Sequence, residues 1–126
     1  MTKLVLIPAL AALLLAGGCT KRLEAPLDRG VCYHVAFDAE GKPRFNRVAE
    51  NVPNLENCAA QLEGMRLRFA ALGKYENNMT GAYQGNFIFI QREGIFTSKF
   101  YDGIRYLALV RTGDGRLAIP GAVPSY

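Results

Sequence analysis

The clearest hydrophobic pattern in the chain is a stripe of apolar residues at helical spacing. Its members recur three or four positions apart, as residues on one helix face do: Leu55, Cys58, Ala59, Leu62, Met65, Phe69 and Leu72. The charged residues of the same stretch are expected to lie largely on other faces: Glu56, Glu63, Arg66 and Arg68. Asn54 can cap the helix N-terminus and Gly73 can end the helix. The pattern therefore predicts one amphipathic helix over residues 55–72.

Shorter segments rich in β-branched and aromatic residues predict strands. These segments are residues 31–37, 43–49, 87–91, 95–101, 104–112 and 116–119. Turn-forming residues separate them, and the sequence Gly-Asp-Gly at 113–115 is a strong hairpin signal. The proline and the two arginines of segment 43–49 suit a strand at the edge of a sheet. The polar stretch from Lys74 to Gly85 is predicted to be a loop.

These elements predict an α+β domain in which the helix packs on a mainly antiparallel sheet of five to six strands. The domain covers residues 30–120, a length that suits a single hydrophobic core. Residues 19–29 are polar, contain a proline and are expected to form a tether that reaches at most about 35 Å. Residues 121–126 are expected to be an irregular tail.

A different hydrophobic pattern occupies the N-terminus. Lys3 precedes an uncharged apolar run over residues 4–16, which ends in small residues and Cys19. A charged start, a short apolar run and small residues are typical of an export signal. The run is too short to cross a membrane, which takes about 20 apolar residues. The sequence Leu-Ala-Gly-Gly-Cys at positions 15–19 resembles the lipobox of bacterial lipoproteins, although Ala16 stands where that family most often has Leu.

The resemblance to bacterial lipoproteins implies a processing route and a location. In that family the signal is cut before the cysteine, so residues 1–18 are expected to be removed and Cys19 to carry the lipid. Thr20 follows, rather than the Asp that retains enterobacterial lipoproteins in the inner membrane. The resemblance thus implies a lipid-anchored protein of the cell envelope, with the outer membrane favoured over the inner. It covers about twenty residues and implies nothing about the rest of the chain.

The chain has three cysteines, and an odd number in an exported protein leaves one over. Lipidation of Cys19, which the resemblance implies, would leave Cys32 and Cys58 as a pair, and an oxidising compartment favours a disulfide between them. Such a bridge would close a loop of about 25 residues, stabilise the fold by roughly 3–4 kcal/mol and fasten the helix to the first strand. A redox or metal pair is the alternative, but the spacing does not match C-x-x-C and only His34 could add a soft ligand.

Candidate catalytic chemistry is sparse. Ser98 and Ser125 are the only serines, His34 is the only histidine, and no G-x-S-x-G motif surrounds either serine. The sequence therefore predicts no catalytic residue, no metal site and no cofactor beyond the covalent lipid on Cys19. A carboxylate pair of the glycosidase type would need two of four acids to come together, which the sequence does not indicate, so these acids are expected to be turn and surface residues: Glu56, Glu63, Glu93 and Asp102. The formal net charge of +4 is too diffuse to indicate a nucleic-acid partner.

One concentration of aromatic and cationic residues is a candidate binding face. Its members are Arg92, Lys99, Tyr101, Arg105 and Tyr106. Aromatic residues and arginines are enriched at interaction hot spots. The alternative is that the aromatic rings of this stretch, among them Phe100 and Tyr106, belong to the core while the cations are solvated.

Together these patterns favour a non-enzymatic envelope lipoprotein, an assembly or accessory factor that binds another envelope protein. The edge strand 43–49 is expected to accept a strand of that partner. Two alternatives stay open: a lipoprotein that binds glycan such as peptidoglycan or inhibits a hydrolase, and a cell-wall enzyme. An open sheet edge or apolar groove would favour the first interpretation, a flat aromatic and basic face the second, and an acid pair in a cleft the third.

Overall fold

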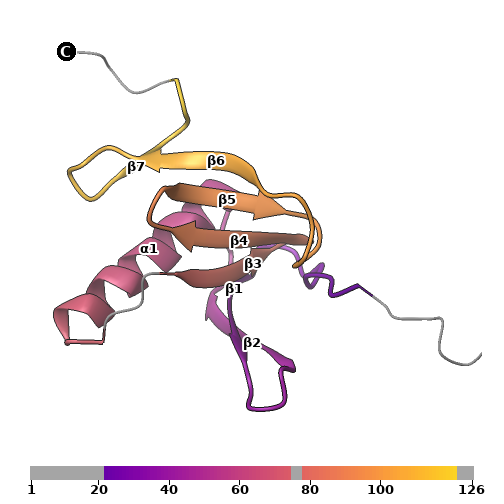
Figure 1. Ribbon diagram of the computed structural model, residues 1–126. Helices are drawn as coiled ribbons and strands as arrows, with labels where there is room; N and C mark the ends of the chain where they lie inside the picture. Colours follow the sequence, from indigo (N-terminus) through magenta and orange to yellow (C-terminus); the bar gives the residue numbers. More distant parts are fainter. Residues whose placement is uncertain (1–21, 75–77, 122–126) are drawn as a thin grey trace, which may run out of the picture.

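The computed structural model describes residues 22–74 and 78–121. It shows an α+β fold, in which one helix packs on a seven-stranded sheet whose neighbouring strands are all antiparallel (Figure 1). The elements in chain order are β1 (Cys32–Phe37), β2 (Pro43–Ala49), α1 (Leu55–Ala71), β3 (Met79–Tyr83), β4 (Asn86–Gln91), β5 (Gly94–Ser98), β6 (Tyr106–Arg111) and β7 (Leu117–Ala118). The sheet order is β2-β1-β3-β4-β5-β6-β7. The predicted fold class is confirmed, but the sheet has seven strands rather than five to six.

The strand missing from the sequence prediction is β3, which lies inside the segment predicted to be a polar loop. It is a central strand, paired with β1 on one side and β4 on the other. Gly81 weakens its sequence pattern, yet this glycine is where the helix meets the sheet. A Cβ at Gly81 would lie 2.8 Å from the carbonyl oxygen of Tyr33 and closer still to Leu62 of α1. The absence of a side chain therefore lets α1 pack directly on the backbone of β3.

The helix begins and ends as the sequence predicts. Asn54 caps it, because its side-chain oxygen accepts a hydrogen bond from the backbone N–H of Asn57 at 2.8 Å. Gly73 follows the last turn with a φ of +82°, which glycine adopts without strain. Two predictions about its faces are wrong: Leu72 is 75% exposed, whereas Glu63 is only 3% exposed.

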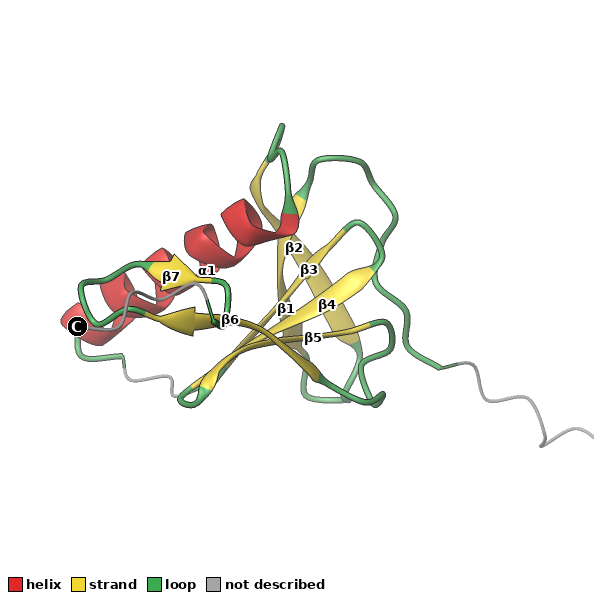
Figure 2. Ribbon diagram, turned by 90° about the horizontal axis from the view of Figure 1, so that it is seen from above, coloured by secondary structure: helices red, strands yellow, loops and turns green. Residues whose placement is uncertain are grey.

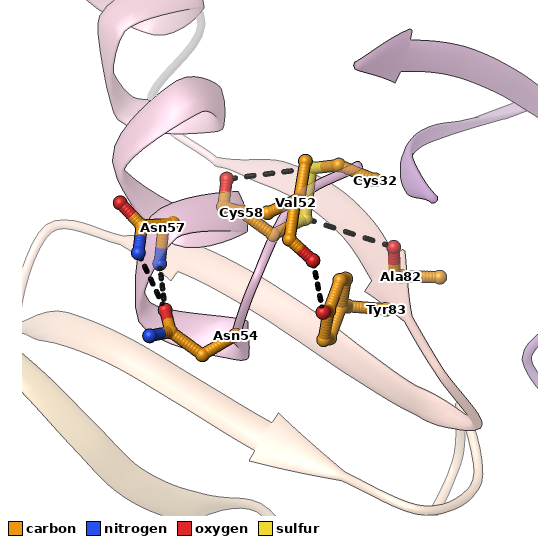
Figure 3. Close-up of a disulfide and its surroundings, with 7 residues drawn as sticks. All are labelled: Cys32, Val52, Asn54, Asn57, Cys58, Ala82 and Tyr83. Atoms are coloured by element: carbon orange, nitrogen blue, oxygen red, sulfur yellow. Dashed lines mark hydrogen bonds between the residues drawn. A yellow bond between two sulfur atoms is a disulfide. The ribbon is translucent and has the colours of Figure 1, made fainter. Parts of the chain in front are cut away.

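The predicted disulfide between Cys32 and Cys58 is confirmed (Figure 3). Both residues are fully buried, and their Cα atoms are 5.3 Å apart. The two sulfur atoms lie 3.4 Å and 3.8 Å from the carbonyl oxygens of Cys58 and Ala82; a disulfide has no S–H, so these are packing contacts. The bridge joins the first turn of α1 to the start of β1, as expected.

Apolar side chains cover both faces of the sheet. On the helix side, Leu62 of α1 meets a cluster drawn from the strands: Met79, Ile88, Ile90, Ile95 and Leu109. The opposite side is rich in aromatic residues: Tyr33, Phe45, Phe87, Phe89, Phe96 and Tyr101. Residues 99–101 and 104–105, predicted to belong to the strands on either side of a turn at 102–103, instead lie in the loop between β5 and β6. Tyr101 of this loop packs on the aromatic side. None of the described helices is long and apolar enough to cross a membrane.

The described part of the predicted tether, residues 22–29, lies against this aromatic face. Ala25 is only 6% exposed, and Glu24 forms an antiparallel bridge with Phe100. The N–H of Tyr101 donates to the carbonyl of Leu23 at 3.2 Å. This part of the segment is therefore docked on the domain. The predicted signal peptide, the lipidation site Cys19 and residues 122–126 lie outside the described residues.

Candidate functional site

The first candidate interaction surface is the outer edge of β2, the strand predicted to lie at an edge. Among the described strands only β1 pairs with β2, so one side of this seven-residue strand is unpaired. The register with β1 is continuous from Pro43 opposite Phe37 to Arg47 opposite Tyr33. Because the pairing is regular, the groups of β2 that do not bond to β1 form a row along its outer edge. Such a row is a template for another strand.

The side chains along β2 give this edge a basic character. Arg44 is exposed, and Lys42 lies just before the strand. Arg47 forms an ion pair with Glu50 at 2.8 Å, and both side chains are exposed. Cations on an edge strand oppose the pairing of two identical copies through like-charge repulsion. A strand that carries acidic side chains meets no such barrier.

Tyr33 of β1 contacts both β2 and the segment that precedes β1. Its ring packs edge-on against Phe45 of β2, with ring centroids 6.1 Å apart. Its hydroxyl donates to the carboxylate of Asp28 at 2.6 Å. This hydrogen bond, together with burial, raises the pKa of Tyr33 above its ordinary value. The side chain of Tyr33 thus links Asp28, which precedes β1, to Phe45 of β2.

A second candidate surface is a groove of about 510 Å³ between α1 and the hairpin formed by β6 and β7. Figure 2 shows α1 and β7 on the same side of the sheet. The groove is lined by residues of α1 and its cap and by apolar residues of the β6–β7 side: Asn54, Asn57, Ala60, Leu109, Leu117 and Ile119. It is short, because β7 has two residues.

Glu63 lines this groove and is the buried member of a charge cluster. Its carboxylate accepts hydrogen bonds from Nε of Arg66 at 2.6 Å and from Nε of Arg111 at 2.7 Å. Arg111 also donates to the carbonyl oxygens of Gln91 at 2.7 Å and Arg92 at 3.1 Å. The cluster therefore ties α1 to β6 and to the turn between β4 and β5. Nothing in the helical spacing of Glu63 signals this, because Arg111 is 48 residues away.

The groove does not supply the acid pair that a glycosidase needs. Glu56 and Glu63 both line it, but they are seven residues apart on the helix, which corresponds to about 10.5 Å along its axis. Glu63 is buried, and each of its carboxylate oxygens accepts a hydrogen bond from an arginine, so this side chain is held in an ion-pair cluster. Asp102 pairs with Arg22 at 3.4 Å elsewhere on the surface. The described residues also contain no group of three or more potential metal ligands.

Ser98 and His34 do not form a nucleophile and base. Ser98 is buried, and its hydroxyl donates to the carbonyl of Phe100 at 2.6 Å. His34 lies on β1, three strands away from β5. Since neighbouring strands are about 4.8 Å apart, the two backbones are separated by roughly 14 Å. Ser125 lies outside the described residues.

The structure divides the predicted aromatic and basic face. Tyr101 points into the aromatic side, with its ring centroid 4.9 Å from that of Phe37 and 5.9 Å from that of Phe89. Arg105 stacks on Phe89, with its guanidinium carbon 3.6 Å from the ring centroid. Lys99 and Tyr106 are exposed on either side of the same loop, whereas Arg92 lies in the turn at the other end of β5. Phe100 is half-buried, and the guanidinium of Arg22 stacks on it.

The described molecule is thus a disulfide-linked α+β domain with one long basic edge strand and one short groove beside its helix. Comparison with protein-family models, with curated proteins and with solved structures finds no significant match to this chain.

Proposed function

We propose that the protein is a lipid-anchored accessory protein of the cell envelope, without enzymatic activity, which binds another envelope protein through the outer edge of β2. The observation that carries this proposal is the unpaired outer side of β2, a strand of seven residues whose register with β1 is continuous from Pro43 to Arg47. Strand addition to such an edge uses main-chain hydrogen bonds for affinity and alternate side chains for specificity.

Two features support an exported and anchored protein. The lipobox-like sequence that ends at Cys19 supports lipidation, and Thr20 after it favours the outer membrane. The buried disulfide between Cys32 and Cys58 suits a protein that folds in an oxidising compartment. The anchor would hold the domain at a membrane, so a partner in the same membrane meets it at high effective concentration.

The charge of the β2 edge narrows the chemistry of the partner. Lys42, Arg44 and Arg47 lie along or beside this edge. Lys42 pairs with Glu40 at 3.9 Å and Arg47 with Glu50 at 2.8 Å, whereas Arg44 forms no ion pair with the described residues. A partner strand with acidic residues at alternate positions would gain complementary contacts as well as main-chain hydrogen bonds. We therefore expect an acidic extended segment of an envelope protein.

Site-specific photo-crosslinking in cells tests the proposal. A photoreactive amino acid at Asn46, exposed on β2, should capture one or two stoichiometric envelope proteins from the full-length lipidated chain. The matched control places the same group at Gln61, exposed on α1. A Cys19→Ala version tests the contribution of the anchor and should give a weaker adduct. Equal adducts from both positions, or no protein adduct from position 46, would contradict the proposal.

Glycan binding is the second candidate, and one observation favours it. A hollow of about 310 Å³ lies beside the aromatic side of the sheet and includes Phe37, Thr80 and Tyr101 in its lining. Exposed aromatic rings suit stacking against sugar faces. Recovery of cell-wall fragments instead of a protein in the crosslinking experiment would replace the first function by this one.

A further inference from the structure

The lipid anchor that the proposed function assigns to Cys19 would be joined to the domain by a very short chain. Arg22, the first described residue, is three positions after Cys19, which spans at most about 10 Å when extended. The residues that follow are fixed on the domain: the N–H of Gly85 donates to the carbonyl of Pro26 at 2.8 Å, and Glu24 bridges to Phe100. The membrane must therefore lie close to Arg22.

Arg22 contacts the loop that connects β5 to β6. Its guanidinium carbon lies 4.0 Å from the ring centroid of Phe100, and its Nη2 lies 3.4 Å from the carboxylate of Asp102. Figure 1 shows the N-terminal segment beside this loop, on the side of the molecule away from the C-terminal end of α1. This loop is consequently the part of the domain that the anchor brings nearest to the bilayer.

The exposed side chains of this loop have the chemistry of an interfacial surface. Ile104 is 75% exposed, and Tyr106, just beyond the loop, is 65% exposed. Lys99 is exposed at the start of the loop. Apolar and aromatic side chains flanked by cations insert at the boundary of anionic lipid headgroups. Both side chains of the ion pair between Arg22 and Asp102 are exposed, so the pair is weak. Arg22 can therefore still interact with anionic lipid.

We infer that Arg22, Lys99 and Ile104 form an anchor-side surface that rests on an anionic lipid bilayer when Cys19 is lipidated. The inference rests on the proposed lipid anchor and adds an orientation to it: the loop between β5 and β6 faces the membrane, and the C-terminal end of α1 faces away. The lipid and this surface act as two membrane signals, which together hold a protein far better than one.

Tryptophan fluorescence gives a direct test, because the chain contains no tryptophan. Ile104→Trp would place the only indole on the anchor-side surface, and Leu72→Trp is the matched control, since both native side chains are 75% exposed. Each lipidated full-length variant is reconstituted into vesicles of phosphatidylethanolamine and phosphatidylglycerol. The indole at position 104 should show blue-shifted emission and quenching by brominated acyl chains, whereas the indole at position 72 should show neither.

The same samples separate the two proposals. Mass spectrometry that finds no lipid on Cys19 would overturn both the anchor and this surface. A lipidated chain whose two indoles are equally exposed to water would overturn the surface alone. As a second measurement, Lys99→Gln in an unlipidated mature chain that begins at Thr20 should weaken binding to the anionic vesicles by about fivefold. Lys74→Gln is its matched control at the far end of α1, and equal losses from both would also overturn the inference.

Discussion

The two edges of the sheet are built in opposite ways. β7, at one edge, has two residues, and its hairpin is held to α1 through β6 by the pair of Glu63 and Arg111. β2, at the other edge, has seven residues and only a proline and cations to discourage pairing. Proteins blunt exposed edges by shortening, covering or charging them. β7 is blunted by its shortness, whereas β2 keeps its length and relies on a proline and cations, which oppose pairing with a second copy but not with the acidic strand proposed as its partner.

The largest expected effect comes from removing the disulfide, which joins α1 to β1, the strand that pairs with β2. Cys32→Ser combined with Cys58→Ser should lower the free energy of unfolding by about 3 kcal/mol, because the unfolded chain loses its crosslink. Urea denaturation measures this. The wild-type chain under reducing conditions is the control and should unfold at the same urea concentration as the double variant.

The next effect concerns the short edge. Glu63→Ala should lower the free energy of unfolding by about 2–3 kcal/mol, because Arg111 keeps its charge but loses its partner in a half-buried position. The β6–β7 hairpin should also exchange its amide hydrogens faster. Glu56→Ala, on the same helix but exposed, should change stability by less than about 0.5 kcal/mol. Similar effects of both substitutions would mean that the cluster does not hold this edge.

A charge reversal on the long edge should affect binding without affecting stability. Arg44→Glu should weaken photo-crosslinking from position 46 by about tenfold, because it repels an acidic partner strand. Its free energy of unfolding should stay within about 0.5 kcal/mol of the wild type, since the side chain is exposed. Arg92→Glu, in an exposed turn, is the control. Unchanged crosslinking in Arg44→Glu would show that binding of the partner does not depend on the positive charge of β2.

The smallest effect is a pH dependence at Tyr33, beneath β2. Its pKa is raised in the folded protein by the hydrogen bond to Asp28 and by burial, so folding favours the protonated phenol. This contribution is complete below the unfolded pKa of about 10 and is lost as the pH rises through the folded value. Denaturation between pH 8 and pH 11 should therefore show stability falling above about pH 10. Tyr33→Phe should reduce that fall.

Local patterns account for the elements that the sequence predicts correctly. The cap at Asn54 and the glycine after the helix mark both ends of α1, and the proline and arginines of β2 mark an edge strand. Cysteine counting leads to the disulfide once Cys19 is assigned to the lipid. Each of these predictions depends on residues close in sequence or on a simple pairing rule.

The failures share one cause, which is that the decisive neighbour is remote. In the sequence Gly81 and the small residues beside it resemble a loop, because nothing nearby shows that Leu62 of α1 packs against this glycine. In the sequence Glu63 resembles a surface acid, because its partner Arg111 lies on the distant strand β6. Arg92 and Arg105 look like members of one surface, but the strand β5 separates them.

By itself, the amino-acid sequence determines the α+β class, the extent of α1 and the position of β2, and it gives the disulfide partners once Cys19 is set aside for the lipid that the resemblance implies. These features follow from backbone propensity and hydrophobic periodicity, which depend on neighbouring residues, and from the tendency of cysteines to pair. The tertiary structure decides that β3 is central, that Glu63 is buried and that residues 22–29 dock on the aromatic face. Those outcomes depend on close packing between distant segments, since only the folded chain brings Leu62 onto Gly81 and Arg111 onto Glu63.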